Sequence, residues 1–163
     1  MFVIRALQDS ERPALRQFWV DHWGSDGMAA RGRLYNLDEL QALVASDQDE
    51  WVGLVTFYFE DSFCEVMSLD SLRPGLGIGT ALLSVVEQKA RQAGCSVLKL
   101  ITTNDNTRAL RFYQKLGFEL TALRCRAVDV SRRLKPSIPE TGYDGIPIRD
   151  EIELQLLLLA PTP

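Results

Sequence analysis

Three glycines alternate within a short stretch that leads directly into a helical pattern. The stretch is "SLRPGLGIGTALL", Ser71 to Leu83, and its glycines occupy positions 75, 77 and 79. Glycine destabilises the interior of a helix or strand by about 1 kcal/mol relative to alanine, so three close together indicate a steric requirement. We therefore expect a strand-to-helix turn in which backbone closely approaches a ligand.

The spacing of apolar residues predicts mainly strands for the first half of the chain. A strand and a helix come first, then a polar, glycine-bearing loop, then three strands, of which the first two form a hairpin through "DQDE". The predicted elements are a strand at 2–7, a helix within 9–24, a loop at 24–36, and strands at 39–46, 50–60 and 63–72.

Strands and helices alternate in the second half. The predicted elements are a helix at about 77–93, a strand at 96–103, a helix at about 107–116 closed by Gly117, a strand at 118–128, mostly connection at 129–150, and a closing strand at 151–159. Antiparallel strands followed by a β-α-β-α-β alternation predict a mixed sheet with helices on its faces. The fold class is therefore α/β, with a single domain over residues 1–163.

Charge and cysteine usage narrow the functional classes. The formal net charge of -4 argues against a nucleic-acid partner, which would require a surplus of Lys and Arg. Cys64, Cys95 and Cys125 are odd in number and form no C-x-x-C pair, so neither a metal site nor a disulfide framework is expected. With no apolar run long enough to cross a bilayer, we expect a cytoplasmic protein with reduced thiols and no membrane partner.

The glycine stretch does not match two familiar nucleotide-binding signatures. The dinucleotide pattern G-x-G-x-x-G needs glycine where Thr80 stands, and the lysine of a P-loop is absent. A glycine turn at a helix N-terminus can still bind an anion, because the first N–H groups and the positive end of the helix dipole face it. A diphosphate could accept hydrogen bonds from the backbone between Leu76 and Thr80. The alternative is a tight turn that only needs positive φ.

A second motif lies in "NTRALRFYQKLGF", where Asn106, Ala109, Tyr113 and Gly117 fall at helical spacing. With the glycine stretch, it resembles the GNAT N-acetyltransferase superfamily, whose motifs are [QR]-x-x-G-x-[GA] and N-x-x-A-x-x-x-Y-x-x-x-G-F. The second motif matches completely. The first begins here with Pro74 in place of Gln or Arg, so it supports a backbone cradle more than a side-chain contact. The order of elements resembles the family fold over nearly the whole chain.

The resemblance implies acetyl-CoA as cosubstrate, without a metal. It puts the diphosphate on the glycine loop and the pantetheine arm between the strands "EVMSLDSL" and "SVLKLITT", where a bulge near Leu69 would free backbone groups. Asn106 then contacts CoA, although a helix cap is an alternative role. The implied CoA-binding residues are Leu69, Pro74, Gly75, Leu76, Gly77, Ile78, Gly79, Thr80, Asn106 and Tyr113.

Two residues are candidates for proton transfer. The resemblance implies that Tyr113 protonates the departing CoA thiolate, whereas its spacing alone fits a core aromatic. For the base we select Glu65, which alternation puts on one strand face with Phe63, Met67 and Leu69. Desolvation among such neighbours makes a carboxylate a stronger base. A structural ion pair with Arg or Lys is the alternative.

Other residues are weaker candidates. Asp70 and Glu153 are reserve bases, and Trp19, His22 and Trp23 belong to a helix that often lines the acceptor pocket in the family. The basic run Arg124, Arg126, Arg132, Arg133 and Lys135 could attract an acidic acceptor, or form a solvated surface.

The motifs together predict acetyl transfer to a primary amine by direct attack in a ternary complex. The alternative is a non-catalytic acyl-CoA-binding or regulatory module on the same fold. The identity of the amine acceptor and the formation of a homodimer stay open.

Overall fold

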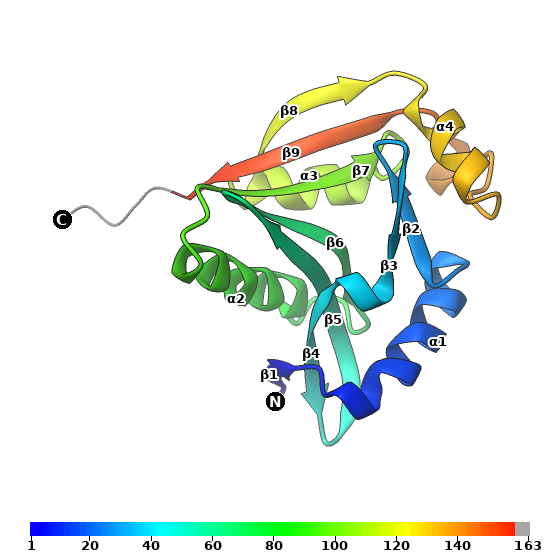
Figure 1. Ribbon diagram of the computed structural model, residues 1–163. Helices are drawn as coiled ribbons and strands as arrows, with labels where there is room; N and C mark the ends of the chain where they lie inside the picture. The colour runs from blue at the N-terminus through cyan, green and yellow to red at the C-terminus, as the bar shows by residue number, and fades with distance from the viewer. Residues whose placement is uncertain (159–163) are drawn as a thin grey trace. The chain divides into compact units, whose positions relative to one another are not determined.

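The computed structural model describes residues 1–158 (Figure 1). Seven strands form one mixed sheet in the order β1-β4-β5-β6-β7-β9-β8, and β2 and β3 form a separate two-stranded sheet. The predicted α/β class with a mixed sheet is confirmed. The chain divides into two compact units, which are described separately below; one contains residues 1–12, 38–98 and 157–158, and the other contains 13–37 and 99–156.

The first unit contains an antiparallel meander covered by one helix. Its elements are β1 (Val3–Ala6), the 3-10 turns η1 (Asp9–Glu11) and η2 (Leu37–Glu39), β4 (Gln41–Asp47), β5 (Glu50–Glu60), β6 (Phe63–Ser71) and α2 (Ile78–Gln92). The helix α2 packs on β4, β5 and β6, and its apolar residues Ile78, Leu82 and Val86 are fully buried. Burial of these side chains is the main favourable term that holds α2 in place.

A glycine of β5 fixes how closely α2 approaches the sheet. A Cβ at Gly53 would lie 2.5 Å from Cγ2 of Ile78 and 2.9 Å from the carbonyl oxygen of Asp70. No side chain fits there without displacing the first residue of α2. Gly53 therefore sets the position of the helix end that follows the glycine loop.

The strand β7 (Val97–Thr103) leads into the second unit. That unit also contains α1 (Arg12–Trp23), β2 (Gly27–Ala30), β3 (Arg33–Asn36), α3 (Thr107–Lys115), β8 (Glu119–Arg124), α4 (Ala127–Leu134), η3 (Tyr143–Gly145) and β9 (Glu151–Leu157). The strands β8 and β9 pair antiparallel, and α4 packs against the β2–β3 hairpin. The predicted closing strand extended to Leu159, which lies outside the described residues.

Two predicted elements are wrong. Residues 24–36, expected to be a loop, form the β2–β3 hairpin, in which Met28, Ala30 and Tyr35 are buried. The strand predicted to reach residue 128 stops at Arg124, and α4 occupies part of the predicted connection. The reversal comes at Arg126, whose φ of 62° is left-handed and ends an extended run.

Within residues 1–158, no helix is both long and apolar enough to span a membrane.

Candidate active site

The glycine loop adopts the left-handed turn that its sequence indicates. Gly75 has φ of 82° and Gly77, the N-cap of α2, has φ of 71°, a region that L side chains rarely adopt. A Cβ at either position would meet nothing within 4 Å. Both glycines are therefore required by backbone conformation and not by crowding, and the space over them is open to a ligand.

The start of α2 presents backbone donors beside this open space. Ala81 donates to the carbonyl of Gly77 at 2.9 Å, which closes the first helical turn. The N–H groups of Ile78, Gly79 and Thr80 precede that bond, and helix geometry gives them no intrahelical acceptor. Since α2 is a 15-residue helix, its dipole adds partial positive charge at this end. The loop can therefore bind a phosphate group through its backbone.

The arginine beside the loop, Arg73, forms two ion pairs. Arg73 donates from Nη1 to Oδ2 of Asp47 at 2.8 Å and from Nη2 to Oε2 of Glu50 at 2.7 Å. Both acids lie at the β4–β5 turn, so the pair anchors the loop to the meander. The charge of Arg73 is thereby largely neutralised, which favours the backbone over this side chain as the anion-binding group.

Glu65, the residue selected as base, is almost fully buried in the first unit. Its exposed fraction is 1%, and the hydroxyl of Tyr58 donates to its Oε2 at 2.6 Å. Tyr58 lies directly opposite Glu65 in the register of β5 and β6. This hydrogen bond orients the carboxylate.

A bulge changes the strand face on which Glu65 lies. Thr56 pairs with Ser68 and the next residue, Phe57, pairs with Val66, so Met67 is the extra residue. The register therefore puts Glu65 on the same face as Ser68, whose hydroxyl lies 2.7 Å from that of Thr56.

The predicted face of β6 is consequently wrong beyond Glu65. Leu69 pairs with Val55 and lies on the opposite face, while Asp70 returns to the face of Glu65. Strict alternation fails because the bulged residue shifts every later side chain to the other side. The bulge itself lies two residues before Leu69, at Met67.

In the second unit, Asn106 and Tyr113 occupy α3 as the motif predicts. The side-chain oxygen of Asn106 accepts from the N–H of Ala109 at 3.1 Å, which confirms its role as the helix cap. Tyr113 is 8% exposed, and its ring packs edge to face on Phe112 and Phe118. Asn106 therefore caps α3 and Tyr113 packs in the core, and neither role prevents a contact with a ligand.

Asn104 and Asp105, which directly precede Asn106, hydrogen-bond a later segment of the chain. Asn104 accepts from the N–H groups of Arg149 and Asp150 at 2.9 and 3.0 Å. Asp105, 2% exposed, accepts from the N–H of Tyr143 at 3.1 Å. These bonds fix the turn from which Asn106 caps the helix.

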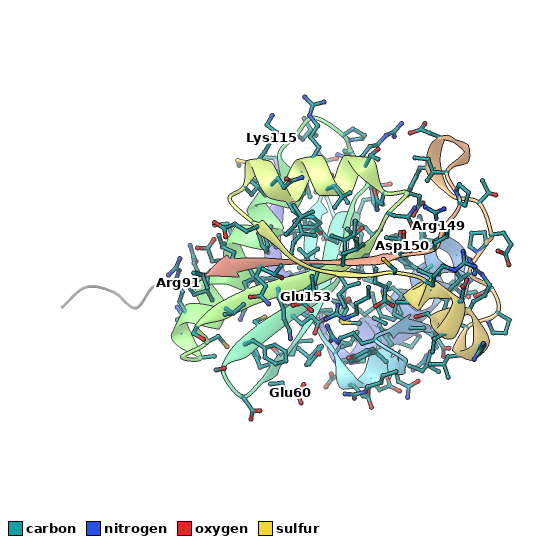
Figure 2. All side chains as sticks on the ribbon, turned by 90° about the horizontal axis from the view of Figure 1, so that it is seen from above. Glu60, Arg91, Lys115, Arg149, Asp150 and Glu153 are labelled. Carbon is teal, nitrogen blue, oxygen red and sulfur yellow. The ribbon has the colours of Figure 1, made fainter. Side chains whose placement is uncertain are left out.

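Glu153, a reserve base that is labelled in Figure 2, accepts hydrogen bonds from a guanidinium and from an amide. Arg124 donates from Nη2 to its Oε2 at 2.9 Å, and Gln155 donates to its Oε1 at 2.7 Å. Burial alone would raise the pKa of Glu153, but the hydrogen bonds from Gln155 and Arg124, with the charges of Arg124 and Lys99, bring that pKa below its ordinary value. Glu153 is therefore a weaker base than an ordinary carboxylate.

The aromatic residues of α1 divide between core and surface. Trp19 is fully buried, Trp23 is 38% exposed, and the exposed His22 stacks on Phe18 at 3.8 Å between ring centroids. His22 therefore lies on the surface of α1.

Most of the basic run is engaged within the chain. Arg126 pairs with Asp129 at 3.1 Å, and Arg132 pairs with Asp129 at 3.3 Å. Lys135 is buried, which lowers the pKa of its amine.

Each unit thus holds part of the predicted set. Glu65, Leu69 and residues 74–80 belong to the first unit, and Asn106, Tyr113 and Glu153 to the second. Sequence reasoning missed Gly53 and Tyr58. A two-residue hairpin turn after Glu60 would have put Tyr58 opposite Glu65.

Comparison with known proteins identifies the family. Residues 4–118 match the model of the Acetyltransferase (GNAT) family. The chain is 44% identical to the protein YdhI of Bacillus subtilis (strain 168) over 153 residues, which cover 93% of this chain and 96% of that protein.

Solved structures share the fold. An acetyltransferase of Bacillus subtilis in complex with CoA has a TM-score of 0.69 at 20% identity, covering 98% of this chain and 100% of that one. A GNAT family acetyltransferase from Elizabethkingia anophelis with acetyl-CoA bound has a TM-score of 0.68 at 22% identity, covering 96% and 98%. The chain belongs to the GNAT family of acetyltransferases.

Proposed function

We propose that the protein transfers the acetyl group of acetyl-CoA to a primary amine. The observation that carries this proposal is the glycine loop, where two left-handed glycines under open space precede the free N–H groups of α2. Membership of the GNAT family and the CoA ligands of the two fold neighbours support the same donor. The cytoplasm is the proposed location.

The loop from Pro74 to Thr80 would bind the diphosphate through backbone N–H groups. The pantetheine arm would follow β6, with backbone groups near Leu69 as its partners, and Asn106 would contact CoA from the start of α3. These roles come from the family motifs, and the open glycine loop supports the first of them.

The proton transfers assign roles to two side chains. An amine is mostly protonated at neutral pH, and only its free lone pair attacks a thioester. We assign Glu65 to accept that proton, directly or through water, because it is a buried carboxylate that the hydroxyl of Tyr58 orients.

The amine nitrogen then attacks the thioester carbon in a ternary complex. A C–N bond forms, the C–S bond breaks, and the CoA thiolate leaves. The hydroxyl of Tyr113 is assigned to protonate that thiolate, as the family motif implies.

A thiol-release assay tests the function. Acetyl-CoA is mixed with amino acids, polyamines, aminoglycosides and peptides, and free CoA thiol and acetylated product are both quantified. We expect at least one amine to release thiol in equal amount to product. CoA binding without turnover of any amine would support the alternative, a non-catalytic acyl-CoA-binding module.

Two variants test the loop separately. Gly77→Val forces a β-branched residue into a left-handed turn and fills the open space, so CoA binding should weaken strongly. Arg73→Ala should weaken it less, because Asp47 and Glu50 already engage that charge. Isothermal titration decides, and the opposite ranking would contradict the backbone cradle.

A further inference from the structure

The strand β8 forms one edge of the seven-stranded sheet. Among the strands of residues 1–158 it is last in the order, with β9 as its neighbour, and in Figure 1 it lies along the margin of the sheet. The outer N–H and C=O groups of an edge strand can pair with another strand. The sequence of β8, ELTALR, contains neither Pro nor Lys, two residues that commonly block such pairing. Its outer edge can therefore accept a further strand.

A bulge places two exposed leucines of β8 on the same face. Leu120 pairs with Leu154 of β9. Leu123 pairs with Ile152, so Thr121 is the extra residue of the bulge. Because positions 152 and 154 lie on one face of β9, Leu120 and Leu123 also share a face. Leu154 is fully buried, whereas Leu120 and Leu123 are 52% and 62% exposed. The two leucines thus extend a buried apolar face to the edge of the sheet.

The strand β8 is self-complementary when two copies of it run antiparallel. A two-fold axis at the centre of ELTALR puts Leu120 of each copy opposite Leu123 of the other. Residues that lie opposite each other in a sheet share a face. The bulge meets this condition, because a regular strand would hold positions 120 and 123 on opposite faces.

The charges of β8 fit the same register. Glu119 of each copy lies opposite Arg124 of the other, and the pairing with β9 puts both residues on the second face of the strand. Glu119 is exposed and has no ion pair within residues 1–158. Arg124 pairs with Glu153, and its side chain is still 36% exposed. Opposite charges across two strands stabilise their pairing, whereas like charges oppose it.

We propose that the chain forms a two-fold homodimer in which the β8 strands of two copies pair antiparallel around an axis between Thr121 and Ala122. The outer backbone groups of each edge then find partners in the other copy. Leu120 and Leu123 leave water on both sides of the axis, which favours association. Both copies use the same surface, so every contact occurs twice.

Sedimentation velocity of the full chain over a series of concentrations tests the proposal. We expect a dimer in wild type. Leu123→Asp should raise its dissociation constant by about tenfold or more, because the substitution alters two sites of the dimer. Leu34→Asp is the matched control, since Leu34 is a 42% exposed leucine on β3, and it should leave the dimer intact.

A charge variant covers the case in which Leu123→Asp does not fold, which melting temperatures would reveal. Glu119→Lys changes an exposed side chain and puts like charges opposite each other at Arg124. It should weaken the dimer less than Leu123→Asp does. An unchanged dissociation constant in a folded Glu119→Lys would contradict the register.

Crosslinking tests the register itself. On a Cys125→Ser background, the variants Leu120→Cys and Leu123→Cys are mixed and oxidised with diamide. We expect the mixture to form a linked dimer faster than either variant alone, because the register puts positions 120 and 123 opposite each other. Mass spectrometry identifies the linked peptides. Equal rates in the mixture and in the separate variants would contradict this pairing.

The oligomeric state of wild type gives the plainest outcome. A monomer at every concentration would overturn the proposal and leave the edge of β8 to a different partner. A dimer that persists in folded Leu123→Asp, or that Leu34→Asp dissociates equally, would also overturn it, because another surface would then hold the copies together. These measurements need neither acetyl-CoA nor an amine, so their outcome is independent of the proposed function.

Discussion

Glu65 and Glu153 are both buried on strands, but different groups contact their carboxylates. Glu65 receives the neutral hydroxyl of Tyr58, while Glu153 receives the guanidinium of Arg124 and the amide of Gln155. Cations around Glu153 stabilise its ionised form and make it a poor proton acceptor. Burial alone therefore does not identify a catalytic carboxylate, since the charge of the neighbours decides between proton transfer and structure.

Replacing Glu65 should lower the rate of acetyl transfer more than the other substitutions below. Glu65→Gln keeps an oxygen that can accept from Tyr58 but cannot take a proton from the acceptor. We expect kcat to fall on the order of a hundredfold or more, with CoA affinity nearly unchanged. Steady-state rates and isothermal titration of CoA check both parts. Loss of thermal stability with an unchanged rate would return Glu65 to a structural role.

Tyr113→Phe tests whether a second group completes the proton path. We expect turnover to fall by about a hundredfold, while the Michaelis constant for acetyl-CoA changes little, because the hydroxyl acts as the thiolate develops. The measurement uses saturating substrates and a rate-limiting chemical step. Phe112→Leu, a change beside Tyr113 in the same aromatic cluster, is the packing control. Unchanged turnover in Tyr113→Phe would leave Tyr113 as a core residue.

Glu153→Gln should change stability more than the pH dependence of the rate. Removing the partner of Arg124 should lower the free energy of unfolding by about 2 kcal/mol at pH 7, as measured by urea denaturation. Because the pKa of Glu153 is lowered by folding, its contribution is present above the ordinary value of 4.5 and is lost as pH falls through the folded value. The gap between wild type and variant should narrow on acidification. A constant gap would contradict the ion-pair assignment.

Tyr58→Phe should give the smallest change. The hydroxyl of Tyr58 hydrogen-bonds the carboxylate of Glu65, so its removal loosens the orientation of that carboxylate. We expect kcat to fall by about tenfold at most, with CoA affinity unchanged. Tyr143→Phe, which changes an exposed tyrosine, should leave kcat in place. An unchanged kcat in Tyr58→Phe would show that this contact does not position the base.

The sequence predicts well where local rules decide the structure. The positive φ of Gly75 and Gly77, the cap at Asn106 and the helical spacing around Tyr113 each follow from a few neighbouring residues. The strands of the meander have clear apolar patterns, and their predicted bounds are close to the observed ones.

Prediction fails where residues that are far apart in the sequence determine the structure. The β2–β3 hairpin is rich in glycine and small residues, and Tyr35 becomes buried only through tertiary packing. The bulge at Met67 reverses the face of β6, and alternation alone gives no sign of it. Arg124 and Glu153 meet across two strands separated by α4, so their pairing depends on a register that local sequence does not determine.

The pH dependence of kcat/KM in Glu65→Gln and Glu153→Gln, measured side by side with wild type, tests the central contrast most directly. The acid limb of such a profile reports the group that must lose its proton for reaction. The account predicts that Glu65→Gln abolishes the acid limb, while Glu153→Gln keeps its position and form within the pH range where the variant stays folded. An acid limb that persists in Glu65→Gln and disappears in Glu153→Gln would contradict it.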